Sequence, residues 1–426
     1  MDLNQALNWP EMALVRQSLM DRSLPDLPTA LGDALAPLAD RCVKAHGKSV
    51  AVAVGSRNID QLDKVVWQVL RFLEKKGFKP FIVPAMGSHG GATAVGQEAL
   101  LAGFNVTETS MQVPVVSDME TRLVARVDEG PRLYIAGSAL DADHIVLINR
   151  VKPHTKFSAA VESGLCKMLT IGLGKIDGAA EFHRSAVTRT FAVIEEAASA
   201  LLKEVNILFG LGLVEDGRGQ LSRVRALVPE SLIEAEKEML SEARSLMGTI
   251  PFDDLDILVV DRMGKDISGI GMDSNVTGRH RDIVGDFYAA PHVKRIFVRD
   301  LSRASQGNAN GIGLADVTTR RLVEQMDPEK TFVNCLAAIS PEKAAVPMHF
   351  ETDRQCLAAC AATTGRAETE SLRIVRIRDT ASLGYLQVSR PLETELRGKS
   401  HLRQLSDWQP LAFDGTGNLQ PFYPKD

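Results

Sequence analysis

The sequence predicts an α/β protein, built from two α/β domains with mainly parallel sheets and a cofactor or substrate cleft between them. The chain has 426 residues, which is enough for two or three domains of ordinary size. Short apolar runs alternate with stretches at helical spacing, and this strand–helix–strand rhythm is typical of parallel sheets. The rhythm breaks near residue 250 and then resumes. We therefore expect an N-terminal domain over residues 1–250 and a C-terminal domain over residues 251–426.

The first domain is expected to begin with helix and loop, followed by an alternation of strands and helices. Residues 49–55 form a short β-branched run, which predicts a buried strand. Residues 59–76 carry Leu and Val at helical spacing and are followed by Gly77, a common helix stop. The other expected strands are 79–84, 123–127, 133–136, 144–149 and 206–213, and the other expected helices are 92–102, 187–203 and 229–246.

The second domain is expected to repeat the α/β pattern. The run LDILVVD over residues 255–261 opens it as a buried strand. Further strands are expected at 295–299, 331–338 and 373–378. The tail 408–426 is rich in Gly, Pro and aromatic residues and is expected to be a surface arm.

Composition excludes several classes of protein. The formal net charge is −5 and aromatic residues make up 5%, which argues against bulk nucleic-acid binding. No apolar run reaches the roughly 18 residues of a membrane span, and the first residues lack the pattern of a signal peptide. The five cysteines are scattered and odd in number, as expected in a reducing compartment. We therefore expect a cytoplasmic protein that binds neither membranes nor nucleic acid.

Two loops that follow expected strands carry the first candidate site residues, since sheets of this class place their sites there. Arg57 follows the first of these strands, and its planar guanidinium suits a carboxylate or a phosphate. A solvated surface arginine is the alternative. His89 lies among three glycines in MGSHGGAT, residues 86–93, where an accessible imidazole suits acid–base chemistry. A purely structural turn is the alternative there.

Two later loops carry the remaining candidates. His154 lies in the basic stretch NRVKPHTK, residues 149–156, which suits an anionic ligand, with a solvated basic loop as the alternative. Lys167 lies in an apolar stretch rich in small residues, where partial burial favours the neutral, nucleophilic amine. A lysine that extends to the solvent is the alternative. His183 follows and is a candidate ligand at the same site. No zinc motif and no GxSxG motif is present.

The order of these motifs resembles the nickel-dependent lactate racemases and their relatives. The shared features are the arginine after the strand 49–55, Gly-Ser-His-Gly-Gly, Lys-Pro-His, Ser-Gly-x-x-Lys and a later histidine. The likeness is strong over about residues 50–185 and weaker to about residue 285. Residues 264–273 also resemble a segment found in a subgroup of these relatives. The resemblance implies a racemase or epimerase of 2-hydroxy acids, with its site in a cleft between two α/β domains.

The resemblance also implies a cofactor, a nickel-pincer nucleotide that holds nickel through carbon and sulfur atoms. Lys167 matches the lysine that carries this nucleotide, and His183 matches the histidine that completes the nickel coordination. His89 and His154 match the two histidines that flank the substrate, and Arg57 matches a substrate-binding arginine. The implied partners are a small 2-hydroxy acid and the proteins that make the cofactor.

The second domain departs from the family where substrate contacts are expected. The family's glutamine and lysine have no clear match, because Gly271 and Ser274 stand in the corresponding stretch. Nearby polar residues that could replace them are Asn275, Arg279, His280 and Arg281, of which Arg279 is our choice as a substrate contact. A larger or more polar acid than lactate, such as a sugar acid or a dicarboxylate, is compatible with this change.

Two other functions stay open at this point. One is an oxidoreductase or lyase on the same fold, and the other is a non-catalytic binding protein for an anionic metabolite. The sequence leaves the choice of acid, the loading of the cofactor and the oligomeric state undetermined.

Overall fold

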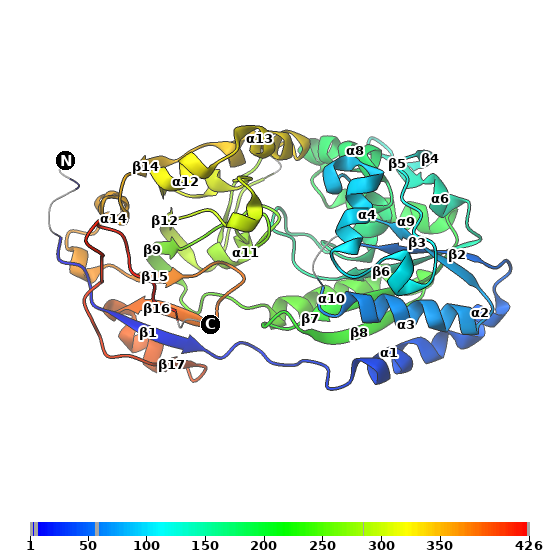
Figure 1. Ribbon diagram of the computed structural model, residues 1–426, viewed down its shortest axis with the longest axis horizontal. Helices are drawn as coiled ribbons and strands as arrows, with labels where there is room; N and C mark the ends of the chain where they lie inside the picture. The colour runs from blue at the N-terminus through cyan, green and yellow to red at the C-terminus, as the bar shows by residue number, and fades with distance from the viewer. Residues whose placement is uncertain (1–2, 4–6, 56–58, 284, 424–426) are drawn as a thin grey trace. The chain divides into compact units, whose positions relative to one another are not determined.

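The computed structural model describes residues 3, 7–55, 59–283 and 285–423, and the chain divides into two compact units (Figure 1). One unit is Met20–Met247, and the other combines Met1–Leu19 with Gly248–Asp426. The first 19 residues thus belong with the C-terminal part of the chain, whereas the sequence assigned them to the N-terminal domain. The cause is the strand β1 (Met12–Gln17), which the sequence pattern missed and which pairs with β16 and β17 near the C-terminus.

The unit Met20–Met247 is built on a five-stranded sheet with the order β3-β2-β6-β7-β8. Its first four strands are parallel and β8 is antiparallel. The strands of this sheet are β2 (Ser49–Val54), β3 (Lys79–Pro84), β6 (His144–Arg150), β7 (Ile207–Glu215) and β8 (Leu221–Leu227). The expected strands 123–127 and 133–136 exist as β4 (Thr121–Arg126) and β5 (Arg132–Ala136), but they form a separate antiparallel pair.

Helices cover both faces of this sheet. They are α1 (Leu27–Leu35), η1 (Ala36–Leu38), α2 (Ala39–Lys44), α3 (Leu62–Lys75), η2 (Gly90–Ala92), α4 (Ala94–Ala102), α5 (Glu108–Met111), α6 (Gly137–Leu140), α7 (Leu165–Lys167), η3 (Met168–Gly172), α8 (Lys175–Arg189), α9 (Val193–Glu204), η4 (Pro229–Ser231) and α10 (Leu232–Leu246). The single helix expected over 187–203 is broken, because Thr190 adopts a φ of +58° between α8 and α9.

Strand β7 shows how the sequence assigns the two faces. Its larger apolar residues, such as Phe209 and Leu211, join the core formed with α1 and α3. Its glycines alternate with them and face the other way. A Cβ at Gly210 would lie 2.6 Å from the side chain of Leu165, and one at Gly212 would lie 2.7 Å from Met239. These glycines therefore allow α7 and α10 to approach the sheet closely.

The other unit contains an eight-stranded sheet with the order β14-β13-β12-β9-β15-β16-β1-β17. The run from β14 to β15 is parallel, and β16, β1 and β17 are antiparallel to their neighbours. Figure 1 shows β1 beside β16 and β17. The remaining strands are β9 (Asp254–Val260), β12 (His292–Val298), β13 (Val317–Thr319), β14 (Met348–Phe350), β15 (Ile374–Ile377), β16 (Tyr385–Ser389) and β17 (Leu402–Gln404), with β10 (Arg279–His280) and β11 (Phe287–Tyr288) as a separate pair.

The expected strand 331–338 is wrong, because these residues lie in helix α13 (Pro328–Ala337) and the turn after it. The side chain of Asp327 caps this helix by accepting the N–H of Lys330, and Pro328 starts it. The other helices of this unit are α11 (Ser274–Thr277), η5 (Arg303–Ser305), η6 (Ile312–Leu314), α12 (Arg320–Gln325), η7 (Pro341–Ala344), α14 (Asp353–Ala362), η8 (Thr369–Ser371), η9 (Arg390–Leu392) and α15 (Glu393–Arg397).

Both large sheets are mainly parallel and carry helices, which confirms the predicted α/β class. Alternate residues of β9, such as Leu258 and Val259, enter two different hydrophobic cores, as expected for a sheet buried on both faces. Within the described ranges, no helix is both long enough and apolar enough to cross a membrane.

Candidate functional site

Lys167 ends the short helix α7, which packs against β6 and β7 of the five-stranded sheet. Residues 164–175 are all described, and among them only Lys167 is not buried. Helix α7 continues directly into the π-helical segment η3, which holds five buried residues. The segment therefore fixes its backbone inside the protein and presents one amine at the surface.

A stacked pair of aromatic rings forms the centre of the candidate site. The ring centroids of Phe157 and Phe191 lie 4.4 Å apart, with an angle of 15° between the planes. The imidazole of His154 stacks on Phe157 at 4.3 Å, and the imidazole of His183 meets Phe191 edge-on at 5.8 Å. We call these two rings the Phe157–Phe191 pair. It joins two histidines that are far apart in the sequence.

Two lysines lie against the same rings. The Nζ of Lys167 is 6.0 Å from the centroid of Phe157, and the Nζ of Lys156 is 5.6 Å from the centroid of Phe191. Both distances are within the range of cation–π attraction. The structure thus brings Lys167, His154 and His183 together around the Phe157–Phe191 pair.

The backbone fixes the imidazole of His154. The N–H of Lys156 donates to Nδ1 of His154 at 3.0 Å. Because Nδ1 accepts this bond, a neutral ring carries its proton on Nε2. The backbone N–H of His154 itself donates to the buried carboxylate of Glu162 at 2.5 Å, and Glu162 pairs with Arg244 of α10. The tautomer and the position of this histidine are therefore both set by its surroundings.

His89 lies in the glycine-rich loop between β3 and α4, and this loop is attached to the segment that carries Lys167. The N–H of Gly87 donates to the carbonyl of Gly172 at 3.0 Å. Gln97 of α4 donates from Nε2 to the carbonyls of Gly87 at 2.8 Å and His89 at 3.4 Å. These contacts connect the His89 loop to the end of η3 through the backbone.

A buried lysine that the sequence did not single out supports this loop from below. Lys175 has no exposed surface, and its ammonium donates to the carbonyl of Pro84 at 2.7 Å and to Oε1 of Gln97 at 2.9 Å. Burial lowers the pKa of Lys175 to about 8, and the charge of Asp118 opposes this shift. Lys175 and Gln97 therefore form a buried chain of hydrogen bonds that holds the His89 loop.

The two arginines proposed as substrate contacts have different outcomes. Arg57 lies outside the described residues. Arg279 is buried in the other unit, where its terminal nitrogens bond the two carboxylate oxygens of Asp316 at 3.2 and 2.5 Å. Asp316 also accepts the N–H of Ile296 at 2.7 Å. The guanidinium of Arg279 is thus already used in a two-point ion pair.

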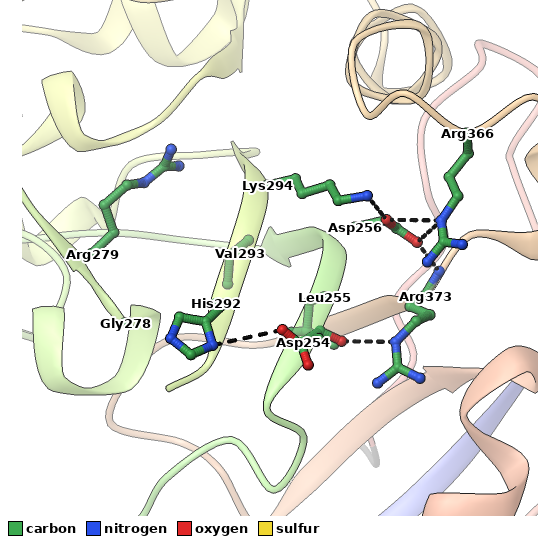
Figure 2. A pocket seen from close by; sticks show the side chains of 10 residues that line it. All are labelled: Asp254, Leu255, Asp256, Gly278, Arg279, His292, Val293, Lys294, Arg366 and Arg373. Carbon is green, nitrogen blue, oxygen red and sulfur yellow. Dashed lines mark hydrogen bonds and ion pairs between the residues drawn. The ribbon is translucent and has the colours of Figure 1, made fainter. Parts of the chain in front are cut away.

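Arg279 also lines a pocket of about 240 Å³ at the amino ends of β9 and β12 (Figure 2). In Figure 2, Lys294 and Arg366 point at the buried carboxylate of Asp256, at 2.8 and 3.0 Å. Arg373 pairs in the same way with Glu395 at 2.6 Å. With Asp254 on its wall, the pocket and its direct partners hold as many carboxylates as cations. This balance gives the pocket no clear preference for an anion.

The sequence missed the residues that hold the candidate site together. They are Phe157 and Phe191, which stack, and Glu162, Lys175 and Glu236, which are buried. A charged residue in an otherwise apolar stretch was the available signal for Lys175, as it was for Lys167. Glu236 lies on the apolar side of α10, where a periodic reading expects Leu or Ala.

Comparisons with known proteins show a likeness in structure but not in sequence. No family model and no curated protein matches the sequence. Among solved structures, the chain is similar to the lactate racemase apoprotein from Thermoanaerobacterium thermosaccharolyticum, with 15% sequence identity and a TM-score of 0.49. The match covers 86% of this chain and 85% of that one. A likeness at this level leaves the function of this chain to be argued from its own residues.

Proposed function

We propose that the protein is a racemase or epimerase of a 2-hydroxy acid that works with a nickel-pincer nucleotide tethered to Lys167. The observation that carries the proposal is the cluster at the Phe157–Phe191 pair. An amine and two imidazoles, from Lys167, His154 and His183, lie against the same two rings. These are three of the residues that the motif order matches to functional positions of the nickel-dependent racemases.

The residues at this cluster suit such a cofactor chemically. A flat pyridinium ring stacks well on an aromatic face, and a lysine amine is a suitable point for a covalent tether. Imidazole is a good nickel ligand, and His183 is the residue proposed to supply it. Since the nucleotide brings carbon and sulfur ligands of its own, one protein histidine is sufficient. When bound, the nucleotide supplies an acceptor for the hydride that leaves Cα of the substrate.

Proton transfer at the substrate hydroxyl is the task of the protein. We assign it to His89 and His154, because two enantiomers present their hydroxyl groups to different sides and need one imidazole each. Nε2 is the atom of His154 that exchanges this proton, since Nδ1 accepts the N–H of Lys156. Arg57 is the proposed contact for the substrate carboxylate. Arg279 is the weaker candidate, because it would first have to release Asp316.

The tether is tested by analysing protein that is produced together with the cofactor-biosynthesis proteins. We expect mass spectrometry to find a nucleotide adduct on the peptide that contains Lys167, and metal analysis to find stoichiometric nickel. Lys167→Ala should lose both. An unmodified Lys167 in a protein without nickel would contradict the proposal.

The reaction is tested with enantiomerically pure 2-hydroxy acids in deuterated water. We expect inversion at Cα with the original hydrogen largely retained, because it travels as a hydride. Extensive entry of deuterium would indicate carbanion chemistry instead. A product other than the inverted acid would favour an oxidoreductase or a lyase. Binding without turnover that survives His89→Ala and His154→Ala would favour a binding protein.

A further inference from the structure

The helix that carries Lys167 is capped by a residue from a distant helix. The first N–H groups of any helix lack partners within the helix itself. In α7, the N–H groups of Leu165 and Cys166 both donate to the carboxylate of Glu236, at 2.6 and 2.9 Å. Glu236 belongs to α10 and is completely buried. It therefore performs from 70 residues away the task that a local capping side chain usually performs.

The residue before the turn is adapted to this carboxylate. A Cβ on Gly164 would lie 2.4 Å from Oε1 of Glu236, so any side chain there would displace the carboxylate. The carbonyl of Gly164 accepts a bond from Nδ2 of Asn149, at the end of β6, at 2.8 Å. The entry to α7 is thus held on one side by the sheet and on the other by α10. Lys167 is the last residue of this three-residue helix.

The environment of Glu236 makes its charge sensitive to pH. Burial raises the pKa of Glu236 to about 7, although the N–H bonds from Cys166 and Leu165 favour the ionised form. The thiol of Cys166 lies beside Glu236, and burial raises the pKa of this thiol well above its usual value. The charges of Glu195 and Lys237 act on the same thiol. A carboxylate accepts N–H bonds more strongly than a carboxylic acid does. The cap is therefore firm when Glu236 is ionised and weaker when it is protonated.

We propose that Glu236 is a positioning residue for Lys167. Its carboxylate holds the Leu165–Lys167 turn in place against β6 and β7. In this way it directs the amine of Lys167 toward the Phe157–Phe191 pair. The inference rests on the proposed function only in one respect, namely that Lys167 carries a nucleotide. The effect of Glu236 on the position of the amine does not require a bound cofactor.

The test uses Glu236→Gln, which keeps the shape of the side chain and removes its charge. Glu238→Gln is the matched control, because Glu238 lies on the same helix but is exposed and pairs with Arg225. The first readout is hydrogen exchange of the peptide that contains Leu165 and Cys166. We expect about tenfold faster exchange in Glu236→Gln, as for the loss of one charge-assisted bond, and no change in Glu238→Gln.

The second readout is acylation of Lys167 by an amine-reactive ester in the protein without cofactor, with exposed Lys203 as the internal reference. In the wild type, the ratio of the two rates should change as pH passes through about 7. In Glu236→Gln the ratio should be higher and independent of pH, because the turn is looser and no carboxylate titrates. A purely structural role would leave this ratio unchanged.

Gly164→Ala provides an independent approach if Glu236→Gln does not fold, because the added methyl group displaces the same carboxylate. It should raise both the exchange rate and the acylation ratio. The proposal is overturned if folded variants show wild-type exchange, or if exchange rises while the acylation ratio stays that of the wild type. Failure of the proposed function is a separate result, since a Lys167 that never carries a nucleotide still gives both readouts.

Discussion

The carboxyl ends of the parallel strands differ between the two units. In Met20–Met247, the loops after β3 and β6 and the helices α7 and α8 contain the described candidate site residues, and Lys167 remains partly exposed. In the other unit, ion pairs fill the same edge. Asp261 follows β9 and pairs with Arg299 at 2.8 Å and with Arg376 at 2.7 Å. Asp353, at the start of α14, also binds Arg299. Of these four charged residues, Asp261, Arg376 and Asp353 are buried.

The C-terminal segment completes this closure. The carbonyl of Leu419 accepts from Arg299 at 3.0 Å, and that of Gln420 accepts from Arg376 at 2.8 Å. The ring of Phe422 lies 4.8 Å from the guanidinium of Arg376. Leu419 is buried here, whereas residues 408–418 and 420–423 are exposed or half-buried, as expected of the surface arm that the composition predicted. The comparison teaches that the carboxyl edge of a sheet marks a site only where polar groups remain within reach of a ligand.

The largest effect is expected from Lys167→Ala, which tests the carboxyl edge of the sheet in Met20–Met247. The variant should lose all turnover, because no other residue of the cluster offers an amine in the same position. Stability should change by no more than about 0.5 kcal/mol, since the side chain is partly exposed. Racemase assays and urea unfolding measure the two quantities. Full turnover in Lys167→Ala would show that the carboxyl edge of the sheet in Met20–Met247 does not contain the site at Lys167.

Arg376→Met tests the edge that is filled by ion pairs. It should lower the stability of the protein and leave the loading of Lys167 unchanged. Removing one member of a buried ion-pair network destabilises a protein by about 3 kcal/mol. Arg376 is 2% exposed and binds both Asp261 and the tail. Unfolding in urea should show this loss, while the loading of Lys167 stays that of the wild type. Arg390→Met, at an exposed arginine that pairs with Glu11, is the control and should change stability little.

Lys175 makes the stability of the unit Met20–Met247 depend on pH. Its pKa in the folded protein is about 8, below the ordinary value of 10.5, so the unfolded chain binds more protons between these two values. The free energy of unfolding should therefore rise as pH increases from about 8 to 10.5, by an amount on the order of 3 kcal/mol from this residue. Lys175→Met should remove this rise. Parallel unfolding curves for wild type and variant across this range would contradict the prediction.

The smallest effect on the reaction is expected from Arg279→Gln. The wild-type guanidinium is occupied by Asp316, and the pocket beside it is balanced in charge. We expect KM for the 2-hydroxy acid to change by less than about threefold, or under about 0.7 kcal/mol. A rise of tenfold or more would show that Arg279 releases Asp316 to bind the substrate.

Local patterns were enough to find many elements but not those that depend on distant partners. Helix α3 and strand β3 lie where their apolar spacing and their flanking residues place them. Strand β1 was missed because its partners, β16 and β17, are nearly the whole chain away. The segment 331–338 was misassigned because a short apolar run fits a strand or a buried helix equally well. The cap at Asp327 and Pro328 was the signal that favours the helix.

The candidate site was predictable to a similar degree. The motifs selected His154, Lys167 and His183, and the structure places all three around the same rings. The rings themselves could not be predicted, because Phe157 and Phe191 stack only once α8 has folded back. Glu236 was also beyond reach, since a buried acid on an amphipathic helix has no distinguishing pattern until its partners are known.

The place of β1 has a consequence for synthesis on the ribosome. Met20–Met247 is inserted into the other unit, so the whole inserted unit emerges before β16 and β17 have been translated. Translation proceeds at roughly 5–20 residues per second, so β1, an apolar strand, waits tens of seconds for its neighbours. During that interval the inserted unit can complete its own core, while β1 stays without the two strands that it pairs with in the folded protein.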